Sequence, residues 1–159
     1  MYKRQIEGNI IVLVSKDEKI LGWIELSDKI RSNSLSSIKR LQQRGIDVIM
    51  LTGDRHEVAK SVSNTVGINT IFSELKPDEK AEQIRQLQKK GTVAMIGDGI
   101  NDAAALTIAD VGIAMGAGSE VALESADIVL VRDDLSDAVA SLDLGRSTMR
   151  KIRSNLVWA

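Results

Sequence analysis

The sequence predicts an α/β fold in which a parallel sheet lies between two layers of helices, as in Rossmann-like domains. From about residue 34 onward, apolar runs of strand length alternate with segments of helix length, which is typical of successive β-α-β units. The runs 93–96 and 128–131 are continuously apolar, as expected of strands buried on both faces. With 159 residues, 43% of them hydrophobic, the chain can bury a core of ordinary size.

The pattern of the N-terminal residues predicts an antiparallel hairpin. Two β-rich runs, 9–14 and 20–26, flank the polar turn 15–19. Helical spacing of apolar residues then predicts a helix over 34–44 that ends at Gly45. The remaining expected elements, in chain order, are strand 46–51, helix 55–66, strand 68–72, helix 77–90, strand 93–96, helix 102–109, strand 111–115, helix 120–124, strand 128–131 and helix 135–158 with an interruption near Gly145.

Composition excludes several classes of function. The formal net charge is −1, so no broad basic field indicates a nucleic-acid partner. The chain has no cysteine, which excludes a disulfide framework and a thiolate metal site. No run of 18 apolar residues is present to span a bilayer, and residues 1–5 lack the apolar segment of a secretory signal.

The most informative stretch is 95–103, where an apolar strand leads into an acidic, glycine-containing loop and then a helix of small residues. Asp98 and Asp102 repel each other unless a cation or a proton neutralises them. An oxygen-rich loop of this kind suits Mg²⁺, and the amide of Asn101 can hold a neighbouring ligand or a phosphoryl oxygen. Alternatively, one of the two acids caps the helix that follows, although a single cap needs only one acid.

A second polar loop, Thr52-Gly53-Asp54, follows the strand 46–51. Functional loops of open parallel sheets gather beyond the carboxyl ends of the strands, so this loop and 97–102 are expected at the same edge. The hydroxyl of Thr52 and the backbone amide of Gly53 can bind a phosphate oxygen. Asp54 has an alternative interpretation as the N-cap of helix 55–66, with Glu57 completing a capping box, and both interpretations remain open.

Lys80 lies in the first turn of the helix that begins at Pro77. A lysine on a helix is usually solvated, but the helix dipole disfavours a cation at this end. A nearby anion would offset that cost, so Lys80 is a candidate phosphate-facing group.

Three further features have ordinary interpretations. Gly116 to Ser119 reads as a tight turn, with Ser119 capping a short helix. His56 is expected to be exposed at a helix start, and Trp23 to pack on the hairpin. The basic residues between Arg146 and Arg153, followed by Trp158, fit the end of an amphipathic helix or a juxtamembrane helix.

In combination, the polar loops resemble the phosphorylation domain of P-type ATPases, which belong to the haloacid-dehalogenase-like superfamily. The resemblance rests on Met50-Leu51-Thr52-Gly53-Asp54, Lys76-Pro77-Asp78-Glu79-Lys80 and Ile96-Gly97-Asp98-Gly99-Ile100-Asn101-Asp102-Ala103-Ala104-Ala105-Leu106, and continues through 113–122 and 126–130. Within that family the chain is most similar to heavy-metal pumps, with copper and silver exporters nearest.

The resemblance implies a site that transfers a phosphoryl group from ATP through an aspartyl-phosphate. Positioning and charge neutralisation carry most of such a reaction. By this resemblance Asp98 would ligate Mg²⁺ directly, and Asp102 would support that site by ligation or by holding the loop. Thr52 and Gly53 would bind phosphoryl oxygens, and Lys80 would neutralise their charge. Asp54 and Asn101 would orient the loop, also around a bound nucleotide.

One departure from the family pattern changes the expectation. The family phosphorylates an aspartate in an Asp-Lys-Thr-Gly-Thr motif, which this sequence lacks. We therefore expect a fragment of a pump, with 1–27 ending a nucleotide-binding domain, 28–145 forming the C-terminal part of a phosphorylation domain, and 146–159 starting a membrane helix. Its partners would be ATP and the rest of the pump (nucleotide, actuator and membrane domains), with the transported cation bound elsewhere and this segment on the cytoplasmic side.

The missing motif also has a structural consequence. In this superfamily the strand that bears the nucleophile lies between the strands that end at Thr52 and Gly97. Without it, either a gap separates those two strands or they pair directly. The chain alone is expected not to hydrolyse ATP.

Two other functions compete with this interpretation. A soluble phosphatase of the same superfamily needs a nucleophilic aspartate upstream of Thr52, where Asp28 is a better candidate than Asp17 but neither fits well. A non-catalytic module that binds or regulates a pump needs no nucleophile at all.

Overall fold

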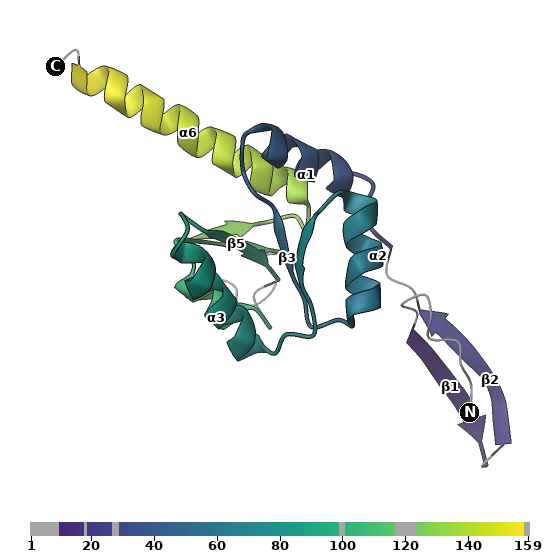
Figure 1. Ribbon diagram of the computed structural model, residues 1–159. Coiled ribbons are helices and arrows are strands. Elements are labelled where there is room, and N and C mark those ends of the chain that lie inside the picture. The colour runs from purple at the N-terminus through teal and green to yellow at the C-terminus, as the bar shows by residue number, and fades with distance from the viewer. Residues whose placement is uncertain (1–9, 18, 27–28, 99–100, 117–123, 158–159) are drawn as a thin grey trace.

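The computed structural model describes residues 10–17, 19–26, 29–98, 101–116 and 124–157 (Figure 1). Its elements, in chain order, are β1 (Ile10–Lys16), β2 (Lys19–Leu26), α1 (Ser34–Gln43), β3 (Ile49–Leu51), α2 (His56–Val66), β4 (Thr70–Phe72), α3 (Pro77–Gln88), β5 (Ala94–Gly97), α4 (Ala103–Ile108), β6 (Val111–Met115), β7 (Ile128–Leu130) and α6 (Leu135–Val157). The predicted order of strands and helices is confirmed for these segments.

The strands of the α/β body form two parallel groups. β3 pairs with β4, with Met50 opposite Ile71. β5 pairs with β6, and β6 with β7. Within the described residues, no ladder joins β3 to β5. Of the two outcomes expected without a central strand, the structure therefore has the gap rather than direct pairing.

The two strand groups nevertheless belong to one layer. Met50 of β3 and Ile96 and Ile113 of the other group face α1, α2 and α6 through two apolar clusters. The next residues along β3 and β6, Leu51 and Ala114, face α3 and α4 instead. Because successive strand residues point to opposite faces, the two groups share the same pair of faces, and helices cover both. The predicted three-layer arrangement is confirmed, with its central layer interrupted between β3 and β5 (Figure 1).

Each face has its own buried cluster. On the α3–α4 side, Ile84, Met95 and Leu106 are 2%, 7% and 1% exposed. On the opposite side, Ile113 is fully buried against α6. Burial of side chains of this size contributes about 1.5–3 kcal/mol each, so these clusters hold the helices on the interrupted sheet.

Several predicted bounds were too long. The strands expected over 46–51 and 68–72 are the three-residue β3 and β4. The interruption expected near Gly145 is wrong, because α6 continues through that glycine without a break. The short helix predicted over 120–124 and the turn from Gly116 to Ser119 lie mostly outside the described residues.

The hairpin β1–β2 is antiparallel as predicted, with Leu13 opposite Trp23. It extends away from the α/β body (Figure 1). Trp23 is 68% exposed and Leu13 65%, so the expectation that Trp23 packs on the hairpin is wrong. A two-stranded ribbon with apolar side chains on both faces buries little surface by itself.

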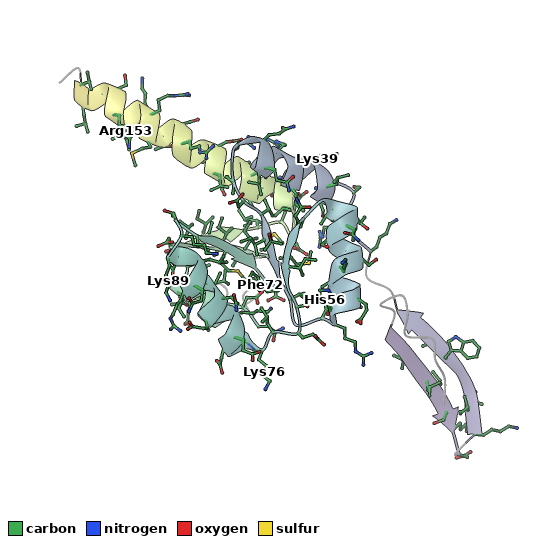
Figure 2. All side chains as sticks on the ribbon, in the orientation of Figure 1. Lys39, His56, Phe72, Lys76, Lys89 and Arg153 are labelled. Atoms are coloured by element: carbon green, nitrogen blue, oxygen red, sulfur yellow. The ribbon has the colours of Figure 1, made fainter. Side chains whose placement is uncertain are left out.

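At the other end, α6 leaves the body after its first turns. Ala138 and Val139 are completely buried, whereas every residue from Leu144 to Val157 is exposed. Arg153 lies on this projecting part (Figure 2). Among the residues that the structure describes, no helix is long and apolar enough to cross a membrane.

Candidate functional site

The acidic loop after β5 is attached to α3 by an ion pair. The ammonium Nζ of Lys80 donates to Oδ1 of Asp102 at 2.7 Å. The two side chains are only 13% and 14% exposed, so water screens their attraction less than it would at the surface. This contact joins residues 22 positions apart and places the predicted cation next to one of the two predicted acids.

The same carboxylate lies against the end of β5. A Cβ atom added to Gly97 would lie 2.6 Å from Oδ2 of Asp102 and 2.8 Å from its Cβ. No real side chain fits there, so the glycine leaves room for Asp102 to reach Lys80. The residue pattern of 95–103 did not indicate this role of Gly97 as a space for the acid.

Asp102 also occupies the N-cap position of α4 but makes no side-chain cap hydrogen bond. Its oxygens are directed to Lys80 and to the Gly97 backbone instead. The interpretation of Asp102 as a simple helix cap is therefore wrong. Carboxylates normally favour the cap bond, so a stronger attraction to the ammonium accounts for its orientation.

Lys80 owes its position to the start of α3. Pro77 is the first residue of the helix, and the carboxylate of Glu79 accepts from the backbone amide of Lys76 at 2.8 Å. These contacts fix the first turn, from which Lys80 reaches across to Asp102. The carboxylate of Asp102 is thus an anion next to this lysine, which offsets the cost of a cation at the start of a helix.

The loop after β3 is held by its own residues. The hydroxyl of Thr52 donates to Oδ2 of Asp54 at 2.8 Å and accepts from the Asp54 amide at 3.1 Å. The N-cap of α2 is Arg55 and makes no side-chain cap bond. The alternative in which Asp54 caps this helix in a capping box with Glu57 is therefore wrong.

Backbone contacts connect this loop to the segment that leads into α3. The amide of Leu75 donates to the carbonyl of Thr52 at 3.1 Å, and the amide of Glu74 to that of Asp54 at 2.9 Å. A Cβ on Gly53 would lie 3.3 Å from the carbonyl oxygen of Leu75. The chain from Glu74 to Lys80 thus spans from the end of β3 to the loop after β5, across the interruption in the sheet.

Four of the predicted site residues form two hydrogen-bonded pairs. Lys80 pairs with Asp102, and Thr52 with Asp54, while Asp98 and Asn101 are exposed in the β5–α4 loop. Gly99 of that loop lies outside the described residues. Among the residues that are described, no three acidic or histidine side chains form a cluster able to hold a metal ion by themselves.

His56 is at the start of α2 and exposed, as predicted. Its Nδ1 lies 3.1 Å from the hydroxyl of Ser73. No hydrogen bond or ion pair of His56 among the described residues involves Asp102 or Lys80, so it is not counted with the candidate site.

Comparison with known proteins identifies the family. The family model for haloacid dehalogenase-like hydrolases matches residues 1–110. The chain belongs to this family. The two acids after β5, the lysine of α3 and the threonine after β3 all lie within the matched residues.

Two relatives give a finer assignment. The chain is 47% identical over 157 residues to the copper-exporting P-type ATPase B of Archaeoglobus fulgidus, covering 99% of this chain and 23% of the relative. It is 51% identical over 149 residues to the copper-transporting ATPase HMA4 of Oryza sativa subsp. japonica, covering 93% and 15%. The chain therefore spans less than a quarter of either relative.

A solved structure agrees with these matches. A zinc-transporting PIB-type ATPase in its E2.Pi state superposes with a TM-score of 0.79 at 37% identity, covering 93% of this chain and 24% of that one. The predicted resemblance to heavy-metal P-type ATPases is confirmed over nearly the whole sequence.

Proposed function

We propose that this chain supplies the Mg²⁺- and phosphoryl-binding half of the aspartyl-phosphate site of an ATP-driven heavy-metal pump of the copper-exporting kind. The observation that carries the proposal is the Lys80–Asp102 pair at the end of β5, in a sequence 47% identical to a copper-exporting ATPase. An enclosed lysine and acid at the carboxyl edge of a parallel sheet suit the binding of a phosphoryl group.

The donor set fits Mg²⁺ better than a metal held by protein ligands alone. Mg²⁺ is usually bound through one or two carboxylates, with phosphate oxygens and water completing its shell. Asp98 is the exposed carboxylate of the β5–α4 loop and would hold the ion directly. Bound there, Mg²⁺ would neutralise charge on the phosphoryl oxygens.

The remaining residues would position the phosphoryl group. Asp102, whose Oδ1 is occupied by Lys80, would hold the loop, and Lys80 would face the incoming negative charge from the same place. Thr52 and Gly53 would donate to phosphoryl oxygens, with Asp54 fixing the hydroxyl of Thr52. Asn101 would orient the loop beside Asp98.

The nucleophilic aspartate would come from a strand placed in the interruption between β3 and β5. The separate pairing of these strands supports this placement. In the pump, residues 1–27 would end the nucleotide-binding domain, 28–145 complete the phosphorylation domain, and 146–159 lead to a membrane helix, with the segment on the cytoplasmic side. ATP and the remaining domains would be its partners.

A segment exchange tests the proposal. This chain replaces the matching 157 residues of the Archaeoglobus relative, and the chimera is incubated with radiolabelled ATP and Mg²⁺. We expect an acid-stable phosphoprotein that Asp98→Asn abolishes, while Lys39→Gln on the exposed face of α1 leaves it intact. A folded chimera that takes no label, or one labelled equally with Asp98→Asn, would contradict the proposal. The 159-residue chain alone should take no label.

A further inference from the structure

A hollow of about 260 Å³ lies beside β4, away from the candidate site. It is bounded by one stripe of α2, by the turn that follows that helix, and by β4, through His56, Lys60, Ser63, Asn64, Ile68, Asn69 and Ile71. The α2 residues recur at intervals of three and four, which places them on one side of the helix. The buried side of α2 is formed by Ala59, Ser63 and Val66, so Lys60 and Asn64 lie on its exposed flank, where polar residues are expected.

β4 has a free edge at this hollow. Within the described residues it pairs only with β3. The carbonyl of Phe72 accepts from the amide of Thr52, so the backbone of Phe72 points toward β3. Because successive residues of a strand direct their backbone groups to opposite edges, the N–H and C=O of Ile71 point away from β3. Ile71 is also the β4 residue that lines the hollow.

The polar groups around this edge are available. The ammonium of Lys60 and the side-chain amides of Asn64 and Asn69 have no hydrogen-bonding or ionic partner in the part of the chain that the structure describes. All three residues are exposed. His56, which also lines the hollow, contacts Ser73 just beyond β4.

The charge of the hollow is one-sided. Among the described residues that line it, Lys60 alone carries a full charge at neutral pH, and none is a carboxylate. An unpaired strand edge is a template for another extended chain, and main-chain pairing with side-chain selection is how such edges recognise peptides. An acidic side chain on that chain would meet Lys60, with the two amides beside it.

We propose that the edge of β4 and the adjoining stripe of α2 bind an extended, acidic segment of a partner polypeptide by β-strand addition. The backbone of the segment pairs with Ile71, and a carboxylate of the segment meets Lys60. This surface is separate from the phosphoryl-binding residues, and the inference does not depend on the proposed pump function.

The test follows backbone amide resonances of the ¹⁵N-labelled 159-residue chain as a short blocked peptide is added. The peptide alternates valine and threonine around one central glutamate. We expect shifts concentrated on Asn69 to Ser73 and on the Lys60 stripe of α2. Lys60→Glu turns an attraction into a repulsion and should weaken binding about tenfold. Lys39→Glu, an exposed lysine on α1 (Figure 2), is the matched control and should leave affinity unchanged.

Two altered peptides separate the parts of the proposal. A central lysine in place of glutamate should prevent binding, and N-methylation of the backbone amide that pairs with Ile71 should do the same. Absence of shifts with the acidic peptide would overturn the inference, as would equal binding of either altered peptide. Acetate or inorganic phosphate reproducing the same shifts would also overturn it, because the hollow would then be an anion pocket rather than a strand-docking edge.

Discussion

The loops after β3 and β5 both present an aspartate at the end of a short parallel strand, but they hold it in different ways. Asp54 bonds to Thr52, two residues away. Asp102 pairs with Lys80 on a different helix, 22 residues away. The first carboxylate is fixed by its sequence neighbours and is exposed, whereas the second is fixed by the tertiary fold and is nearly enclosed. Changes at the second loop should therefore cost more stability than equivalent changes at the first.

The largest effect is expected from Gly97→Ala. The new methyl would overlap Asp102, so the carboxylate must move and Lys80 must lose its partner. Crowding and the broken pair together should lower the free energy of unfolding by about 3–5 kcal/mol, as measured by urea denaturation. Gly145→Ala is the control, since a Cβ there meets nothing within 4 Å and alanine should stabilise that helix by roughly 0.5–1 kcal/mol. Equal stability of the two variants would show that Asp102 does not lie against Gly97 as described.

Breaking the ion pair from either side should have the next largest effect. Lys80→Met leaves the nearly enclosed carboxylate of Asp102 without a counter-charge. Asp102→Asn leaves the ammonium of Lys80 without one. Each should lower the free energy of unfolding by about 2–3 kcal/mol, less than for a fully buried pair. A double-mutant cycle should return a coupling energy of at least about 1 kcal/mol. Additive effects of the two substitutions would mean that the pair contributes nothing.

A smaller effect is expected in the other loop. Thr52→Val removes the hydroxyl that donates to Asp54 and accepts from its amide. Because the carboxylate and the backbone amide of Asp54 can form hydrogen bonds with water instead, the loss of stability should be about 0.5–1.5 kcal/mol. Thermal unfolding of Thr52→Val beside Thr52→Ser, which keeps the hydroxyl, would measure it. A loss as large as that of Asp102→Asn would refute the contrast between the two loops.

The smallest effect concerns a third acid, Asp134, which follows β7 and is held mainly by Ser136, two residues away. Hydrogen bonds from the hydroxyl and then the amide of Ser136, aided by Asn33, lower the pKa of Asp134 below its usual range. A lowered folded-state pKa stabilises the protein above the unfolded pKa of about 4, and this contribution is lost as the pH falls through the folded value. Asp134→Asn should therefore reduce the slope of the free energy of unfolding against pH below about pH 4. An unchanged slope would contradict the stabilising role of the Asp134 carboxylate.

The parts of the fold that sequence alone predicted are those set by local pattern. Apolar periodicity predicted α1, and Gly67 ends α2 in the left-handed conformation that favours glycine. The β3 and β4 bounds were missed because apolar residues such as Ile46 and Ile68 at the strand approaches look no different from strand residues. Gly145 was expected to break α6, yet an exposed glycine weakens a helix only modestly.

The sequence selected candidate residues for the site but not the contacts among them. Strand-end position and residue type selected Asp98, Asp102 and Thr52, and a place in the first turn of a helix selected Lys80. The pairing of Lys80 with Asp102, the space left by Gly97 and the bridge from Thr52 to Leu75 depend on how α3 packs across the sheet. Such contacts join residues that are distant in the chain, and no local pattern encodes them.

The continuity of α6 has a mechanical consequence. Its first turns are fixed by the buried Ala138 and Val139 and by the ion pair of Arg44 with Asp143, and no bend separates them from the exposed turns beyond. The stretch from Asp143 to Val157 is about 20 Å long at the usual helical rise. A tilt of a few degrees at the root would therefore displace the far turns by more than an ångström, so the helix acts as a lever that amplifies small rearrangements in the sheet beneath it.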